Sequence, residues 1–425
     1  MSMRTRSRSR RAIAVIAGAV VSALVLAGCS FGGSAAEPDV PAQTDVAFPD
    51  DVVKGLQDAV TSAMGTSGSS GAIVGVWAPW SGSWIAGLGT QRPDGGGDVT
   101  ADQRFRAGKV TRAMTCDALY GAAAAGKVKL DDPVSEYVSG VPDLAAVTLQ
   151  ELCDGTSGIG SYTDQLYGAW LSNPQRDWDP RYLASFGLGE PRPTPPGDAY
   201  KDSDAGYVLL GLALERATDM SAADILRTYV TDPLGLAATS LSDLPSSGAL
   251  HGGQSMPNAE GALDCAAPLD LTGVSSSGGF TDAGVVTDIR DLGRYVQALA
   301  SGSLVDDEDR FAHPLPVSAD GPSWYTADGG ALIAGTLIGQ YGKMPGYLTA
   351  AFADPKTGLT VAVVLNNSAG DGRVAEYLAW QLAAIASKAP AAEGETAPEA
   401  GLPWTAEQFG EAIASSAVCT PPASE

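Results

Sequence analysis

The chain has 425 residues, of which 26 are Lys or Arg and 49 are Asp or Glu, so its formal net charge is −23. Hydrophobic residues make up 44% of the chain, which is enough for a large core and excludes a chain disordered throughout. The acidic balance argues against nucleic acid as a partner, because neutralising phosphates requires clustered basic residues. The two histidines, His251 and His313, lie in loop-like contexts, so we expect neither a metal site nor another cofactor.

The N-terminal segment is typical of an export signal. Five arginines precede an apolar run over 12–27, which is short for a membrane span. The run ends in Leu26-Ala27-Gly28-Cys29, which resembles the cleavage motif of bacterial lipoproteins. That resemblance implies removal of residues 1–28 and attachment of diacylglycerol to the thiol of Cys29. We therefore expect a protein anchored through lipid at the extracytoplasmic face of the bacterial cell membrane; an uncleaved membrane anchor is the alternative.

The charge distribution explains why lipid must supply the anchoring. Residues 1–28 hold five arginines and no acidic residue, so the formal charge falls from −23 to −28 without them. Such an acidic surface would be repelled by anionic headgroups. Residues 29–47 are small and polar, and we interpret them as the lipidated cysteine and a tether to the globular part.

The predicted elements follow in an order typical of an α+β domain. Apolar spacing predicts a helix over 52–64, and a hairpin signal predicts strands over 72–77 and 83–88 around the turn 79–82. Residues 105–240 are predicted to be largely helical. Later strands are expected over 330–339, 348–352 and 359–365, and helices over 374–387 and 405–418, after a linker at 389–402. We therefore expect an antiparallel sheet flanked by helices, with an all-helical insertion.

Four cysteines besides Cys29 allow three disulfide pairings in an oxidising compartment. We predict Cys116–Cys153 and Cys265–Cys419. Free buried thiols are the alternative, because connectivity cannot be read from sequence.

Several short motifs follow one another along the chain. They are Gly126-Lys127-Val128-Lys129-Leu130-Asp131-Asp132-Pro133-Val134, Leu152-Cys153-Asp154-Gly155-Thr156-Ser157-Gly158, Pro196-Gly197, Gly206-Tyr207-Val208-Leu209-Leu210-Gly211, Pro233-Leu234-Gly235-Leu236, Gly278-Gly279 with Thr287 and Asp291-Leu292, and Pro345-Gly346-Tyr347. In this order they give the chain a resemblance to the class C serine β-lactamase and D-alanyl-D-alanine carboxypeptidase family, whose members are related to penicillin-binding proteins, and the resemblance covers about residues 50–387. It implies a β-lactamase/transpeptidase-like fold over 48–388, followed by a linker and C-terminal extension over 389–425.

The same resemblance implies a catalytic arrangement. In that family a Ser-x-x-Lys turn opens the central helix, with Ser as acyl nucleophile and Lys assisting its deprotonation. A Tyr-x-Asn motif relays protons and binds substrate, and a His- or Lys-x-Gly segment holds the substrate carboxylate.

The residues at these positions do not fit that chemistry. The resemblance aligns Lys109 with the nucleophile and Arg112 with the motif lysine. Lys109 has no hydroxyl, and Arg112 stays protonated and cannot act as a base. The second motif reads Asp202-Ser203-Asp204, and in the third segment Lys343 alone keeps the expected charge.

No displaced site is found elsewhere. No Ser lies three residues before any Lys, so Ser-x-x-Lys is absent from the chain. Lys356-Thr357-Gly358 spells the third motif, but it follows Asp354-Pro355 between apolar runs and is interpreted as a hairpin turn. Thr111 is expected to point toward packing, and Ser203 sits mid-motif.

Three hypotheses remain for the substituted residues. We favour ion pairing of Lys109 and Arg112 with Asp202 and Asp204 across the former cleft, because partly buried charges need partners. Alternatively, Lys109 serves as an amine nucleophile, although nearby carboxylates favour its charged form. A third hypothesis is a pocket in which Lys109, Arg112 and Lys343 hold a carboxylate or phosphate without turnover. Four tryptophans are expected either in hairpin and core packing or along a groove: Trp77, Trp80, Trp84 and Trp170.

We therefore expect a lipid-anchored envelope protein of this family that has lost acyl-transfer catalysis and serves in binding or scaffolding. A peptidoglycan-type or other anionic ligand is the expected partner. The alternative is an active serine hydrolase of the superfamily, a D-Ala-D-Ala carboxypeptidase, β-lactamase or esterase, that uses other groups.

Overall fold

The computed structural model describes residues 36–192, 194–305, 307, 309–399 and 401–419. The predicted signal segment 1–28 and Cys29 lie outside these residues. Among the described helices, none combines the length and the apolar character needed to cross a membrane.

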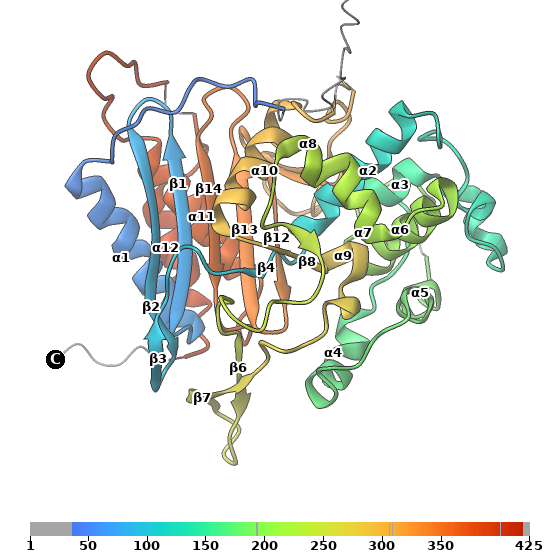
Figure 1. The fold of residues 1–425 in the computed structure, drawn as a ribbon, viewed down its shortest axis with the longest axis horizontal. Coiled ribbons are helices and arrows are strands. Elements are labelled where there is room, and N and C mark those ends of the chain that lie inside the picture. Colours follow the sequence, from blue (N-terminus) through green and yellow to red (C-terminus); the bar gives the residue numbers. More distant parts are fainter. Residues whose placement is uncertain (1–35, 193, 306, 308, 400, 420–425) are drawn as a thin grey trace, which may run out of the picture. The chain divides into compact units, whose positions relative to one another are not determined.

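A nine-stranded antiparallel sheet forms one half of the described domain, and a block of helices forms the other half (Figure 1). The strand order is β3-β2-β1-β14-β13-β12-β11-β10-β9. The bounds are β1 Gly71–Ala78, β2 Gly82–Arg92, β3 Gly95–Asp98, β9 Leu315–Pro316, β10 Tyr325–Asp328, β11 Ala331–Ala334, β12 Leu337–Met344, β13 Tyr347–Ala353 and β14 Thr360–Leu365.

Two smaller sheets lie outside the main one. Their strands are β4 Phe105–Arg106, β5 Ser240–Leu241 and β8 Val285–Thr287, in the order β4-β8-β5, and the hairpin of β6 Gly253–Pro257 and β7 Leu263–Asp270.

The helices lie in two groups, on opposite faces of the main sheet. The first group is α1 Asp50–Ser67, α11 Arg373–Ala386 and α12 Ala406–Ser415. The second is α2 Val110–Ala124, η1 Val134–Glu136, η2 Pro142–Ala146, α3 Leu149–Cys153, α4 Thr163–Ser172, α5 Pro180–Leu188, α6 Asp204–Thr218, α7 Ala222–Leu226, η3 Arg227–Thr231, α8 Asp232–Leu234, η4 Ser276–Gly278, α9 Phe280–Ala283 and α10 Ile289–Ser301.

Helices cover both faces of the central strands, which explains their nearly continuous apolar sequence. In β14, Val361 and Val363 face the α1–α11 side, whereas Ala362 and Val364 face the helical block. A strand that is buried on both faces cannot show clear apolar–polar alternation. The antiparallel sheet, the flanking helices and the helical insertion therefore agree with the predicted α+β architecture.

The prediction of one strand over 330–339 is wrong. The segment folds back on itself: β11 pairs antiparallel with β12, with Ala334 opposite Leu337. Gly335 takes a left-handed φ of 59° at the turn. Two apolar runs separated by a Gly-Thr pair look like one strand when only hydrophobicity is followed, because the reversal needs just two residues. Helix α10 and the β6–β7 hairpin are absent from the elements predicted above.

The C-terminal extension packs against the domain. The indole N–H of Trp80 donates to Ala389 O at 3.1 Å, and that of Trp404 donates to Trp380 O at 3.0 Å. Helix α12 begins with a capping box at Thr405 and lies against α11. At the other end, residues 36–47 also contact the domain, with Ala36 N donating to Pro233 O at 2.8 Å.

Candidate functional site

Lys109 and Arg112 lie at the N-terminal end of α2, the central helix of the helical block. Lys109 directly precedes the helix, and every residue from Val110 to Tyr120 is buried. Gly108, with a left-handed φ of 57°, turns the chain into the helix. The three-residue spacing places both cations on one side of the first turn.

Three acidic residues face these two cations. Asp202 lies in the loop before α6, and Asp204 is the first residue of α6. The hydroxyl of Ser203 accepts the N–H of Gly206 at 3.0 Å and so fixes the start of this helix. Asp282, from α9, completes the group. We call Lys109, Arg112, Asp202, Asp204 and Asp282 the charge cluster.

The charge cluster is held by short ion pairs. Lys109 Nζ lies 2.9 Å from Asp202 Oδ2 and 3.2 Å from Asp204 Oδ1. Arg112 Nη2 lies 2.7 Å from Asp204 Oδ1, its Nε lies 2.7 Å from Asp282 Oδ1, and its Nη1 pairs with Asp202. The side chain of Arg112 is 2% exposed and that of Lys109 is 20% exposed. The structure thus brings together the four residues predicted to pair, and it adds Asp282.

The electrostatic setting keeps both bases charged. Burial and the neighbouring Arg112 oppose the ammonium of Lys109, but the three carboxylates outweigh them and raise its pKa above the ordinary value. Burial also opposes the guanidinium of Arg112, whose pKa the same carboxylates raise further. Neither side chain can therefore take up a proton from a substrate or hydroxyl near neutral pH.

The acids of the cluster titrate differently from one another. Desolvation opposes ionisation of Asp202, but Arg112 and Lys109 lower its pKa below the ordinary value. Burial raises the pKa of Asp282 to about 7, although Arg112 opposes the shift. With two cations and three acids, a proton on Asp282 makes the cluster neutral overall.

Sequence reasoning missed Asp282. It lies far along the chain from the other acids and in no expected motif. The available signal is weak: Asp282 is the single charged residue within 271–287. Asp282 is surrounded in the sequence by small, uncharged residues, and a charged side chain that is buried needs a partner.

The hydroxyls considered above serve structural roles. Thr111 is fully buried, where its hydroxyl donates to Gly108 O at 2.8 Å and accepts from Val285 N at 3.2 Å. Ser203 caps α6 and donates to Gly160 O at 3.2 Å. Ser161 lines the cleft described below, and its hydroxyl donates to Asp202 O at 3.2 Å.

Lys343 lies outside the charge cluster, although it lines the same cleft as Lys109 and Arg112. Its Nζ donates to Gly370 O at 3.3 Å and lies 5.1 Å from the ring centroid of Tyr167. No ion pair among the described residues includes Lys343, and burial lowers its pKa.

Strand alternation explains why Lys343 does not pair with the acids of the charge cluster. Adjacent residues of β12 point to opposite faces, and Gly342 is the one that faces α2. A Cβ at Gly342 would lie 2.6 Å from Lys109 Cβ, so the close approach requires glycine. Gln340, on the same face of β12 as Gly342, also lines the cleft and donates to Gly330 O at 3.4 Å.

A cleft of about 1180 Å³ opens over the charge cluster. Its charged lining residues include Lys109, Arg112, Asp164, Lys201, Asp202, Asp204, Asp320, Lys343, Asp371 and Arg373. Its aromatic lining residues are Tyr167, Tyr200, Trp324, Tyr325, Tyr341, Tyr377, Trp380 and Phe409. The aromatic side was not predicted, because most of its residues come from segments with no motif; Tyr341, in the segment of Lys343, is the exception.

The four tryptophans considered from the sequence are packing residues. Trp80 and Trp170 are buried, and Trp77 fills the space between Gly75 of β1 and Gly293 of α10. Trp84 packs on the α1–α11 side. None of these four is among the described residues that line the cleft.

Lys356-Thr357-Gly358 is a turn, as predicted. It connects β13 to β14, and the carboxylate of Asp354 accepts the N–H groups of Lys356 and Thr357 at 2.9 Å each. Of the histidines, His251 lies 3.4 Å from Asp270, and His313 N donates to Asp328.

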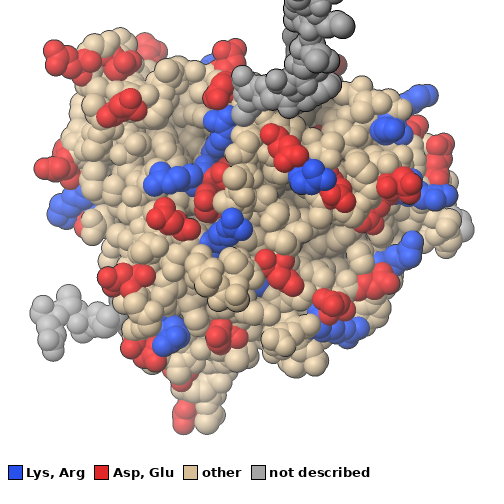
Figure 2. Space-filling model, viewed as in Figure 1, with Lys and Arg blue, Asp and Glu red and all other residues tan. Residues whose placement is uncertain are grey.

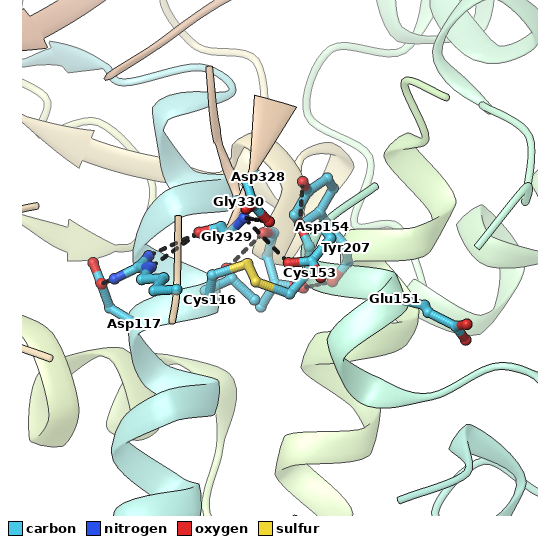
Figure 3. Close-up of a disulfide and its surroundings, with 12 residues drawn as sticks. Cys116, Asp117, Glu151, Cys153, Asp154, Tyr207, Asp328, Gly329 and Gly330 are labelled. Atoms are coloured by element: carbon cyan, nitrogen blue, oxygen red, sulfur yellow. Dashed lines mark hydrogen bonds and ion pairs between the residues drawn. A yellow bond between two sulfur atoms is a disulfide. The ribbon is translucent and has the colours of Figure 1, made fainter. Parts of the chain in front are cut away.

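Both predicted disulfides are confirmed. Cys116–Cys153 joins α2 to α3, with the two Cα atoms 5.5 Å apart, and Cys265–Cys419 joins β7 to the segment after α12, with Cα atoms 6.1 Å apart. Figure 3 shows the first disulfide beside Asp154, Gly329 and Gly330. A Cβ at Gly330 would lie 2.5 Å from Cys116 Sγ. The disulfide therefore ties α2 to α3 one helical turn beyond Arg112 and packs against Gly330.

Within the described residues, no group of three or more His, Cys, Asp or Glu side chains could hold a metal ion. Basic and acidic side chains are interspersed on the face of the molecule that Figure 2 shows.

Proteins of known structure and a protein-family profile are similar to this chain. A family profile described as Beta-lactamase matches residues 56–384. A D-stereospecific amidohydrolase from Streptomyces has a similar structure: TM-score 0.67, 23% identity, covering 78% of this chain and 99% of that one. So does the octameric penicillin-binding protein homologue from Pyrococcus abyssi: TM-score 0.66, 20% identity, covering 84% and 80%.

One curated relative is similar over a shorter stretch. Penicillin-binding protein 4* of Bacillus subtilis (strain 168) is 28% identical over 114 residues, which are 27% of this chain. The matched stretch spans about a quarter of that relative, since it covers 25% of its length. The structural neighbours share the fold, and the family profile covers well over half of the chain. The predicted fold and family are thus confirmed: the chain has the fold of these structural neighbours and belongs to the Beta-lactamase family.

Proposed function

We propose that this protein is a non-catalytic member of its family that binds an acidic, peptidoglycan-type ligand at the outer face of the cell membrane. The observation that carries the proposal is the charge cluster, which occupies the positions where the family has its nucleophile and base. Lys109 and Arg112 stand in place of Ser and Lys, and three carboxylates hold them.

The chemistry of acyl transfer supports this proposal. A nucleophile must present a lone pair, and a base beside it must accept a proton. Lys109 has its pKa raised by the surrounding carboxylates, so its amine carries a proton instead of a lone pair. Arg112 cannot accept a proton at all. The amine-nucleophile hypothesis for Lys109 is therefore disfavoured.

The open cleft supports a binding role. A sealed remnant would leave no room for a ligand, whereas about 1180 Å³ lies above the cluster. Lys343 lines this space and makes one hydrogen bond, although an ammonium has three donors. A ligand carboxylate at Lys343 would supply the missing counter-charge.

The expected location fits such a ligand. The basic segment, the apolar run and Cys29 resemble a lipoprotein signal, so the domain would sit next to the cell wall. Lipid at Cys29 would hold a surface too acidic to bind the membrane by charge.

Family membership favours one competing function, that of an active serine hydrolase. The structurally similar amidohydrolase from Streptomyces acts on D-stereoisomers by its name. Ser161 and Ser318 line the cleft and carry hydroxyls. Ser161 donates to a backbone carbonyl, and no base activates it among the described contacts.

The test for catalysis is labelling with fluorescent penicillin, followed by boiling in detergent and electrophoresis. We expect no covalent adduct and no release of product from a D-amino acid amide. The Streptomyces amidohydrolase serves as the positive control for the amide. A boiling-resistant adduct on this protein would establish the competing function and refute ours.

The test for binding is calorimetric titration with N-acetyl-D-alanyl-D-alanine and with its C-terminal amide. We expect the acid to bind at least about tenfold more tightly than the amide, the difference that about 1.4 kcal/mol makes. Lys343→Met should abolish the difference. Lys356→Met, in the exposed turn after β13, is the matched control and should preserve it. Equal affinities for acid and amide in the unaltered protein would contradict the proposal.

A further inference from the structure

Part of the cleft is lined by aromatic side chains from four separate segments. Trp324 precedes β10, Tyr341 lies in β12, Tyr377 and Trp380 lie in α11, and Phe409 lies in α12. We call these five residues the aromatic lobe. Val317, Pro322 and Leu332 line the cleft beside them.

The C-terminal extension builds part of this lobe. Phe409 lies beyond residue 384, where the family profile stops matching. Helix α12 is held in place by Trp404, whose indole donates to Trp380 O at 3.0 Å, by buried Ile413, and by the disulfide at Cys419. Phe409 therefore adds to the lobe from outside the segment that the family profile matches, whereas the other four rings lie within it.

The rings support one another and leave partly exposed faces. Tyr377 and Phe409 stack with centroids 5.3 Å apart, and Trp380 meets Phe409 edge-on at 5.0 Å and Trp324 at 5.6 Å. Trp380 is buried, whereas Trp324, Tyr341, Tyr377 and Phe409 are only partly buried. An apolar guest would cover these faces, and a planar ring would also gain edge or stacking contacts.

A second observation also points to a ligand. The indole N–H of Trp380 is buried and has no hydrogen-bond partner among the described residues. A buried donor without a partner is unfavourable, and native proteins rarely leave one unexplained. Trp380 is among the residues that line the cleft, and the π face of an aromatic guest would offer this N–H a weak acceptor.

We propose that the aromatic lobe is a second subsite, which takes an aromatic group of the ligand whose acidic end is held at Lys343. The inference rests on the proposed binding function for the acidic end, but the lobe can be tested without it. The ligand class is thus an amphiphile with an acidic head and an aromatic tail.

The experiment uses ω-phenylalkanoates of increasing chain length, measured by calorimetric titration of the full-length protein. Three comparison series accompany them: the same acids without the ring, straight-chain fatty acids of equal carbon number, and the uncharged ω-phenylalkanols. At the chain length that spans from Lys343 to the lobe, we expect the ring to tighten binding about tenfold to hundredfold over the ringless acid. The equal-carbon fatty acid should gain less.

Three variants test whether the tighter binding given by the phenyl ring arises in the aromatic lobe. Phe409→Ala removes part of the lobe, and Val317→Trp fills it while leaving α12 intact; each should abolish the gain from the ring. Tyr182→Ala removes an exposed aromatic residue of α5, outside the cleft lining, and should preserve the gain. Thermal unfolding identifies any variant that fails to fold, and Val317→Trp remains decisive if Phe409→Ala does so.

The possible outcomes distinguish three claims: that the lobe binds a ligand, that Lys343 holds the acidic end, and that the lobe prefers an aromatic group. A ring that adds nothing at any chain length, while the acids still bind through Lys343, overturns the lobe and leaves the proposed function standing. Phenylalkanols that bind through the lobe when no acid prefers Lys343 support the lobe and overturn the acidic anchor. Equal gain from fatty acids and phenylalkanoates overturns the aromatic preference.

Discussion

Replacing Arg112 by Met should destabilise the protein strongly. Arg112 is 2% exposed and pairs with three carboxylates, two of which are themselves 1–2% exposed. Without it, Lys109 is the only cation left in the cluster to face all three. Removing one partner of a buried pair costs about 3–5 kcal/mol, because the remaining charge is left in a poorly solvated place. That cost is a large share of the about 5–15 kcal/mol by which folded proteins are stable.

The assay is equilibrium unfolding in guanidinium chloride at neutral pH, followed by tryptophan fluorescence. Arg227→Met is the matched control, because Arg227 pairs with Asp224 on an exposed helix surface and its loss should leave the midpoint unchanged. A double-mutant cycle with Asp204→Asn tests the contact itself. We expect the double variant to be more stable than the sum of the two single effects predicts.

Two results would refute the reasoning. A loss in Arg112→Met no larger than that in Arg227→Met would mean that the cluster does not depend on its guanidinium. A coupling energy near zero between Arg112 and Asp204 would mean that the two side chains do not meet in solution.

Three further predictions concern Asp282, Cys29 and the positions aligned with the family's catalytic motifs. Asp282 holds its proton more tightly in the folded than in the unfolded protein, so its contribution to stability is complete below its ordinary pKa of 3.8 and is lost as the pH rises to about 7. Thermal unfolding across this range should show a smaller loss in Asp282→Asn than in the unaltered protein, with exposed Asp58→Asn as control; parallel curves would contradict this. Cys29→Ala should move the protein from the membrane to the soluble fraction of the producing bacterium, and unchanged partition would argue against lipid anchoring. Lys109→Ser combined with Arg112→Lys should still give no penicillin adduct, because Asp202 cannot serve as the tyrosine relay; an adduct appearing before Asp202→Tyr is added would show that the relay is dispensable.

Much of the fold could be predicted because its signals are local. The helix at 50–67, the first hairpin and the strands on either side of the turn at 354–358 all follow from short patterns of apolar and turn residues. The hairpin within 330–344 could not be predicted, since its turn interrupts an apolar run by only two residues.

The candidate site shows the same division. Lys109, Arg112, Asp202 and Asp204 could be found because ordered motifs mark their positions. Asp282 and Phe409 could not, since only tertiary packing brings α9 to Arg112 and α12 to the cleft. Lys343 could also be found from its motif, but sequence spacing does not show whether it contacts the acids of the cluster or lines the cleft beside them.

The charge cluster also limits how the family's Ser, Lys and Tyr could be introduced at these positions. Lys109→Ser would leave Arg112 as the cluster's remaining cation against three carboxylates, and Arg112→Lys would keep the charge but lose guanidinium contacts to Asp204 and Asp282. A designer who introduced the family residues one at a time would therefore pass through weakened proteins. The set would have to be exchanged together, with Asp282 included although no catalytic motif contains it.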